Sequence, residues 1–229
     1  MSKWDVFYEQ LITQGGYKDV LLGLRNTLAI AVCGLLIGVF IGTVIACVQV
    51  AGKRNKIAKG FSIAGTVYTA VFRGTPILVQ LLIFHYILFQ NINIDGLLEA
   101  IIVFGLNSGA YVAEIMRGGI ESVDAGQLEA GRTLGMSYIT AMIKIVFPQA
   151  IKNVIPTLGN ELIALTKDTS VAGYVATMDL TRAFRLIASA KYEYMVPYLM
   201  LALCYFIIIL IMTIVIRLIE RRLKKSEKR

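Results

Sequence analysis

Charged side chains are scarce in this sequence. Asp, Glu, Lys and Arg together make up 17% of its 229 residues, and hydrophobic residues make up 57%. Soluble domains contain about 25% charged and about 45–50% apolar residues. The shortage of charge therefore excludes an ordinary soluble domain and indicates that lipid is the solvent for most of the chain.

Groups used in catalysis and metal binding are also few. The sequence has one histidine, and its three cysteines do not have the spacing of a metal site. The only Gly-Lys pair, Gly52-Lys53, has Cys47 where a phosphate-binding loop needs its first glycine. The sequence thus predicts no metal, no cofactor and no nucleotide-binding loop. His85 lies in an apolar run, where we expect a packed or interface histidine, with a proton relay as the alternative.

The hydrophobic residues are concentrated in runs, and a helix needs about 20 residues to cross a bilayer. The cleanest uncharged runs are 27–52 and 194–216, and weaker runs lie between them. We predict an all-α integral membrane protein with a single domain over residues 1–229 and about five spans. The predicted spans are about 20–51, 61–90, 96–117, 138–165 and 194–219.

The first two spans have distinctive residues. Gly34, Gly38 and Gly42 recur at every fourth position of the first span, a spacing that allows close packing of helices. Arg73 and Pro76 lie inside the second span. Because a charge and a proline are both costly in lipid, this position must be buried in protein or face water.

The basic residues predict the orientation. The formal net charge is +8, and Lys and Arg cluster directly after the first span, at 53–59, and after the last, at 217–229. Because cytoplasmic loops carry an excess of Lys and Arg, both clusters are expected in the cytoplasm and the N-terminus outside. Their position beside the spans argues against nucleic acid as a partner. Residues 1–19 lack an apolar segment, so we expect no cleavable signal peptide.

Residues 118–140 predict a short helix between the third and fourth spans. Asp124 and Gln127 have the spacing of a capping box. The stretch 125–134 can form a helix, and Gly135 is suited to end it in the left-handed conformation. The sequence therefore predicts a short, capped cytoplasmic helix.

Several residues of this region fall in one register: Glu129-Ala130-Gly131, Gly135, Ile145 and Pro148. This pattern resembles the EAA-x3-G-x9-I-x-L-P loop of permease subunits in binding-protein-dependent ABC importers. Gly131 replaces the second Ala, and Phe147 replaces Leu. The family uses the short helix to dock in a cleft of the ATPase subunit, and an ordinary capped loop helix is the alternative. The residues to which the resemblance assigns coupling are Gln127, Glu129, Ala130, Gly131 and Gly135.

Further matches follow in order along the chain: Arg73-Gly74-Thr75-Pro76, Ala110-Tyr111-Val112-Ala113-Glu114-Ile115, Pro148-Gln149-Ala150 and Lys167-Asp168-Thr169-Ser170. Together they resemble the polar amino-acid permeases of the histidine, glutamine, arginine and cystine type, over residues 20–220. The resemblance implies a type I ABC importer core in a bacterial inner or plasma membrane, with no enzymatic activity in this chain. It also implies alternating access. The implied partners are two ATP-binding ABC subunits, a second permease copy or a paralogue, and an extracytoplasmic amino-acid-binding protein.

Polar residues at membrane depth are the candidates for the solute path. Asn107, Tyr111 and Glu114 share one face of the third helix because they lie at i, i+4 and i+7. Glu161 and Asp168 share a face of the fourth helix if that helix continues past Leu165. Ionisable groups at this depth usually face a cavity or a partner.

Each ionisable candidate also has a structural alternative. Glu114 can pair with Arg117, Glu161 can pair with Arg73 or Lys167, and Asp168 can cap a helix. The negative charge of Glu161 mildly favours a cationic amino acid such as arginine, lysine or histidine as the solute. Cystine and glutamine remain alternatives.

Two other classes of protein predict different sequences. An ion-coupled secondary transporter predicts inverted internal repeats and no docking helix, and we find no convincing repeat. A membrane-embedded enzyme requires clustered catalytic groups such as paired histidines, and none stands out. We therefore rank both below an importer permease.

The predicted topology is tested by labelling with a membrane-impermeant thiol reagent. Single cysteines placed in 53–59, 118–140 and 217–229 are expected to stay unlabelled in intact cells, because all three segments lie in the cytoplasm. Permeabilised cells serve as the control, in which the same cysteines react. Labelling from outside intact cells at any of the three contradicts the topology.

Overall fold

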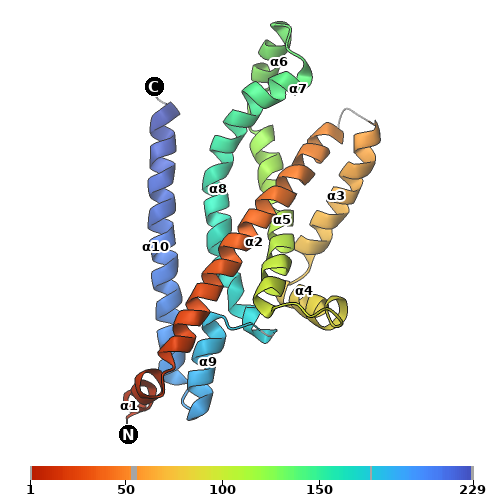
Figure 1. The fold of residues 1–229 in the computed structure, drawn as a ribbon. Coiled ribbons are helices and arrows are strands. Elements are labelled where there is room, and N and C mark those ends of the chain that lie inside the picture. Colours follow the sequence, from red (N-terminus) through yellow and green to blue (C-terminus); the bar gives the residue numbers. More distant parts are fainter. Residues whose placement is uncertain (1, 53–55, 176, 228–229) are drawn as a thin grey trace.

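A computed structural model describes residues 2–52, 56–175 and 177–227 (Figure 1). Over these residues all regular structure is helical, which confirms the predicted all-α class. The long helices are α2 (Tyr17–Gly52), α3 (Lys56–Gly74), α5 (Gly96–Glu121), α8 (Phe147–Asp168) and α10 (Met195–Glu227). The short α-helices are α1 (Lys3–Tyr8), α4 (Ile77–Ile83), α6 (Ala125–Thr133), α7 (Tyr138–Ala141) and α9 (Leu180–Ala190). Single turns of other helix types are η1 (Glu9–Thr13), η2 (Phe84–Leu88), η3 (Met142–Val146) and η4 (Thr169–Tyr174).

Three helices of the described part are long and apolar enough to cross a membrane: α2, α5 and Met195–Arg222 of α10. The helices Ala58–Gly74 and Ile77–Leu88 are long and apolar enough to cross a membrane only when they are taken together, and the chain bends by 106° between them. Whether the predicted second span, 61–90, crosses the membrane remains a prediction, and the structure shows two helices with a sharp bend between them in its place. The physical reason is Pro76, which has no backbone N–H, adopts an extended ψ of 139° and starts the new helix α4.

The predicted fourth span, 138–165, corresponds to α7, η3 and α8 in succession. Helix α8 packs against α5, α2 and α10, so it belongs to the same bundle. Because α8 carries charged residues such as Lys152 and Glu161, it is less apolar than the three helices that are apolar enough to cross a membrane. A topology of five spans therefore remains a prediction.

Helices α2 and α5 approach each other closely along the glycines of α2. A Cβ added at Gly38 would lie 2.6 Å from Ser108 Oγ, and one added at Gly42 would lie 2.6 Å from the backbone nitrogen of Ala113. Such distances are too short for any side chain, so the glycine spacing is a packing face, as predicted. It fixes how α5 sits in the bundle.

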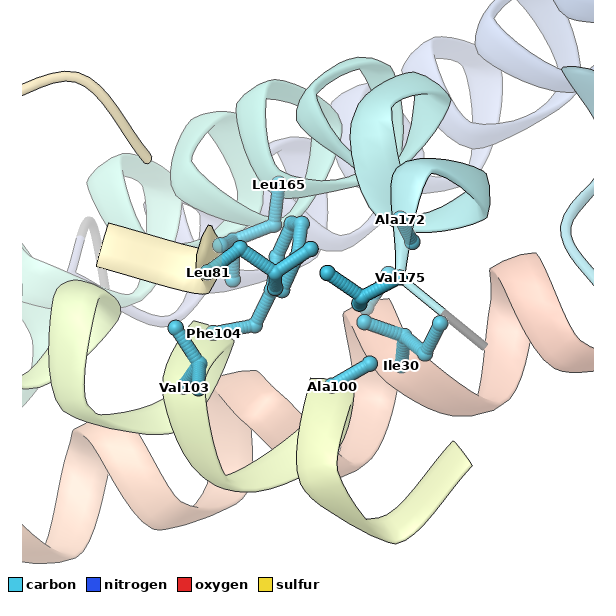
Figure 2. Packing of buried hydrophobic residues seen from close by; sticks show 9 residues of the cluster. Ile30, Leu81, Ala100, Val103, Phe104, Leu165, Ala172 and Val175 are labelled. Atoms are coloured by element: carbon cyan, nitrogen blue, oxygen red, sulfur yellow. The ribbon is translucent and has the colours of Figure 1, made fainter. Parts of the chain in front are cut away.

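A buried hydrophobic cluster joins α2, α4, α5, α8 and η4 (Figure 2). Leu81 of α4 points into it toward Phe104 of α5 and Leu165 of α8, and all three side chains are buried. The cluster anchors α4 after the chain has turned at Pro76. The remaining buried members of the cluster are Ile30, Ala31, Ala100, Val103, Ala172 and Val175.

The two ends of the bundle differ (Figure 1). Helix α6, the adjoining ends of α2 and α3, and the C-terminal end of α10 lie at one end, and α1 and α9 lie at the other. The described residues of the three segments predicted to be cytoplasmic thus lie at one end, which we call the α6 end. Lys53, Arg54, Lys228 and Arg229, which carry part of the charge argument, lie outside the described residues. Which end faces the cytoplasm remains a prediction.

The close approach of α2 and α5 predicts the effect of one methyl group. We expect Gly42→Ala to lower stability by about 1–3 kcal/mol, because the methyl group meets the backbone of α5 at a distance that a side-chain rotation cannot relieve. The matched control is Gly60→Ala, since Gly60 is exposed and a Cβ there has nothing within 4 Å among the described atoms. Thermal unfolding of the two purified variants measures the difference. A Gly42→Ala variant as stable as the unsubstituted protein contradicts this packing.

Candidate functional site

The break between α3 and α4 is held by two side-chain amides. Gln80 Nε2 donates to the carbonyl oxygens of Phe72 at 2.8 Å and Thr75 at 3.0 Å. Asn107 Nδ2, from α5, donates to the Phe72 oxygen at 3.3 Å and to Gln80 Oε1 at 3.0 Å. Backbone carbonyls that lose their helical partners at the break are therefore satisfied inside the protein, as the membrane interior requires. The Asn107 amide serves the break, which gives this candidate a structural role.

Arg73, near the end of α3, contacts two of the candidate residues, Tyr111 and Glu114. Its guanidinium nitrogen Nη1 is 3.6 Å from Glu114 Oε2, and its guanidinium carbon lies 5.4 Å from the centre of the Tyr111 ring. Arg117 Nη2 donates to the same Glu114 oxygen at 2.6 Å. Glu114 is thus shared by two arginines, one of which is the partner that the sequence predicted. The network links the break to the α6 half of α5.

Glu161 of α8 has a different environment. Ser108 Oγ, on α5, donates to Glu161 Oε1 at 3.2 Å, and the Glu161 side chain is partly buried. Within the described ranges, Glu161 forms no ion pair with Arg73 or Lys167. The predicted alternative of pairing with Arg73 is wrong, because Arg73 binds Glu114 instead.

Helix α8 continues past Leu165 and ends at Asp168, so Glu161 and Asp168 do lie seven residues apart on one helix. That separation places both carboxylates on the same face. Asp168 is exposed and its side chain forms no capping hydrogen bond at the start of η4. The alternative of a helix cap is therefore not found.

Four of the five candidates consequently form two groups around α5. Asn107, Tyr111 and Glu114 contact the break, whereas Glu161 contacts α5 through Ser108. Sequence reasoning missed Ser108. Its only local signal is a hydroxyl in an apolar stretch of a span.

A second buried polar contact was also missed. His85 Nδ1 lies 2.9 Å from Glu99 Oε2, and Glu99 is only 2% exposed. His85 is therefore packed, in agreement with the main expectation, but against a buried carboxylate. Glu99 lies near the start of the predicted span 96–117, and the residues next to it in the sequence do not indicate that its carboxylate is buried.

Helix α6 lies where the sequence predicted a short helix. Asp124 accepts a hydrogen bond from the Gly126 amide at 2.7 Å, and Gly135 ends the segment with a φ of +84°. Gln127 accepts from Gln149 at 3.4 Å, on the following helix α8. Asp124 and Gly135 therefore mark the two ends of α6 as predicted, but the capping box predicted for Asp124 and Gln127 is not formed, because the Gln127 side chain bonds Gln149 instead.

The residues to which the resemblance assigns coupling differ in how exposed they are. Gln127, Glu129 and Ala130 are exposed, and so is Leu134, at 80%. Gly131 is buried, and a Cβ there would lie 2.6 Å from Ile145 Cδ1. The glycine that replaces alanine in the motif therefore lets α6 pack on η3. Exposed Leu134 is an apolar residue that sequence reasoning did not select.

Comparisons with known proteins agree with this architecture. Residues 34–225 match the family described as binding-protein-dependent transport system inner membrane component. The chain is 37% identical over 210 residues to the arginine transport system permease protein ArtQ of Bacillus subtilis, covering 91% of this chain and 94% of ArtQ. It is 35% identical over 208 residues to the putative glutamine transport system permease protein GlnP of Rickettsia typhi, covering 89% of this chain and 92% of GlnP.

A solved structure is similar over nearly the same length. This is a chain of an amino acid ABC transporter crystallised with histidines, with a TM-score of 0.83 and 38% sequence identity. The similarity covers 93% of this chain and 97% of that one. The sequence match and the structural match therefore both extend over almost all of the helical bundle.

Proposed function

This chain belongs to the family of binding-protein-dependent transport system inner membrane components, and we propose that it imports a polar amino acid with a preference for cationic side chains. As a family member it is the membrane-spanning permease subunit of an ABC importer. ATP is hydrolysed by separate subunits, and a binding protein delivers the solute. The chain itself carries out no covalent chemistry.

The observation that supports a cationic solute is the environment of the Glu161 carboxylate. Its carboxylate is partly buried, receives one hydrogen bond from Ser108 and has no ion-pair partner in the described part of the chain. A carboxylate in this position attracts a positively charged side chain, and the attraction strengthens as water is excluded. Asp168 on the same face adds a second negative charge. The proposed path therefore follows this face of α8.

The similarity to an arginine permease and to a transporter crystallised with histidines supports the same preference. The similarity to a glutamine permease supports a neutral solute instead, and cystine is a further alternative. In those cases Glu161 would bind the ammonium group that all amino acids share. A panel of arginine, lysine, histidine, glutamine and cystine distinguishes these alternatives in transport by the reconstituted complex.

The proposed assembly has two permease chains, identical or paralogous, and two ATP-binding subunits. The α6 surface formed by Gln127, Glu129, Ala130 and Leu134 is the proposed contact with an ATP-binding subunit, because it is exposed and projects from one end of the bundle (Figure 1). The solute-loaded binding protein would contact the opposite end. Closure of the ATP-binding subunits would then move α6 and rock the two permease bundles between their two orientations.

Coupling through α6 is tested at the residue that ends it. We expect Gly135→Val to abolish the stimulation of ATP hydrolysis by the loaded binding protein, because a β-branched residue strongly resists a φ of +84°. Membrane insertion is expected to remain normal. The control is Thr133→Val, which places the same side chain two residues earlier inside α6. Full stimulation of the Gly135→Val complex would remove the coupling role from α6.

Solute selectivity is tested at Glu161. We expect Glu161→Gln to reduce transport of arginine or lysine by at least about tenfold, roughly 1.4 kcal/mol, because it removes the charge and keeps the volume. Ser108→Ala is the control, since it removes the hydrogen bond and keeps the charge. The complex is expected to assemble normally, because no buried cation loses its partner. An assembled Glu161→Gln complex that transports arginine and lysine at the normal rate disproves the preference.

A further inference from the structure

The N-terminal segment, residues 2–14, takes no part in the proposed transport path. It forms α1 and η1 at the end of the bundle opposite α6 (Figure 1). Ser2 and Asp5 form a complete capping box, in which Ser2 Oγ accepts from the Asp5 amide at 3.2 Å and Asp5 Oδ2 accepts from the Ser2 amide at 2.7 Å. Because so short a helix is marginal in water by itself, contacts with its surroundings must stabilise it.

One face of this segment packs against the bundle. Phe7 is 6% exposed and joins a hydrophobic cluster with residues of α9 and α10, and Leu11, one turn later, packs against the same cluster. Gly15 reverses the chain with a φ of +79°, and a Cβ added at Gly16 would lie 2.8 Å from the carbonyl oxygen of Gln10. The segment is therefore folded back against α9 and α10 in one fixed orientation.

The other face of the segment presents three large side chains to the surroundings. Trp4, Tyr8 and Ile12 recur at every fourth position, and Trp4 is 60% and Tyr8 63% exposed. We call these three residues the outer stripe. The charged neighbours of the stripe have partners within the chain, since Asp5 accepts the capping hydrogen bond and Lys3 lies 3.9 Å from Glu193. The outer stripe is thus an apolar and aromatic surface without a partner among the described residues.

The outer stripe lies beside the start of a membrane span. Helix α1 packs against α10, and Tyr194 and Tyr198 at the start of α10 are exposed, with ring centres 5.9 Å apart. Further along α10, Leu199, Leu203 and Phe206 are exposed, and no residue of its most apolar stretch is buried in the described structure. Aromatic side chains therefore gather at the end of a helix whose surface is left for lipid.

Tyr192, between α9 and α10, adds an independent observation. Its φ is +54°, a conformation that is costly for a bulky side chain and that glycine normally occupies at the end of a helix. The Glu193 amide donates to the Ala188 oxygen at 3.1 Å and so closes the end of α9 around this residue. Tyr192 is nevertheless 84% exposed. A strained aromatic residue that points away from its own chain indicates a role in contact with something outside it.

We propose that the N-terminal segment is an interfacial anchor that lies in the surface of the bilayer at the end opposite α6. Tryptophan and tyrosine combine an apolar ring with a polar tip, and they are enriched where acyl chains meet head groups. The outer stripe enters the acyl chains, the capped edge with Ser2 and Asp5 faces water, and Tyr192 belongs to the same aromatic belt. Through Phe7, the anchor also holds α9 at the level of the bilayer surface.

Two protein partners are the other candidates for this surface: a second permease chain and the solute-loaded binding protein. A binding protein dissociates after it delivers its solute, which would leave the outer stripe in water for part of each cycle, whereas the bilayer covers it throughout. The exposed surface of α10 beside the stripe requires lipid in any case. The bilayer is therefore the partner that the observations favour.

Trp4 is the single tryptophan of the sequence, so its fluorescence reports on this segment alone. The test uses the full-length permease in phosphatidylcholine liposomes, with lipids brominated either near the head group or near the chain end as quenchers. We expect bromines near the head group to quench Trp4 more strongly. The ratio of the two effects is expected to place the ring about 5–10 Å below the head groups, as for other interfacial helices.

Two control variants calibrate this measurement, both made in a Trp4→Phe background. Phe206→Trp reports from the exposed surface of α10 and is expected to respond more strongly to bromines near the chain end. Leu134→Trp reports from the exposed end of α6 and is expected to respond to iodide in the water and not to the brominated lipids. The native tryptophan serves in the main measurement, so that measurement does not depend on the folding of a variant.

The anchoring of α9 is tested by amide hydrogen exchange in the same liposomes. Trp4→Ser combined with Tyr8→Ser is expected to speed exchange in residues 2–14 and in α9, because loss of the interfacial contact loosens the segment that packs on α9. Exchange in α5 is expected to stay unchanged. The matched control is Gln14→Ser, which changes an exposed residue outside the outer stripe and is expected to leave α9 unchanged. Unchanged exchange in α9 of the double variant contradicts the anchoring.

Three fluorescence results would overturn the interfacial position. Quenching of Trp4 by iodide without quenching by brominated lipid places the segment in water. Quenching by neither assigns the stripe to a second permease chain. Loss of the lipid quenching when the ATP-binding subunits and the loaded binding protein are added assigns it to the binding protein. That last measurement is the difference between the unsubstituted and Trp4→Phe complexes, which removes the tryptophans of the partners.

Discussion

The close approach of α2 and α5 is the constraint on which the rest of the structure depends. Gly38 leaves no room for a side chain over Ser108, so the two helices are in backbone contact at the middle of the bundle. This contact fixes the rotation of α5. That rotation directs Asn107 toward the break between α3 and α4 and Ser108 toward Glu161 of α8. Adjacent residues of one helix thus contact two different parts of the bundle.

The break is the second consequence of packing within lipid. A chain that turns by 106° at Pro76 leaves backbone carbonyl groups without their helical partners, and Gln80 and Asn107 supply the missing donors. The arginine at the break is held by Glu114, whose side chain is 30% exposed. Ion pairs with such exposure contribute little to stability, so the network serves mainly to position Arg73.

Local features of the sequence predicted local features of the structure well. Asp124 and Gly135 mark the two ends of α6 because capping depends only on neighbouring residues. Pro76 signalled a problem in the second span, but the turn depends on Leu81 entering a core built from α2, α5 and α8. The partner of Glu161 lies 53 residues away in the chain, at Ser108. Hydropathy and spacing contain no information on such contacts, because helix packing decides them.

The central claim is that this chain is a passive path moved by ATP-binding subunits. Uptake of a radiolabelled amino acid into proteoliposomes tests it most directly, with the permease reconstituted alone or together with its ATP-binding subunits and binding protein. The account predicts uptake only with the complete complex, binding protein and ATP, and no response to an imposed proton or sodium gradient. Uptake by the permease alone, driven by such a gradient and abolished by an ionophore, would contradict it.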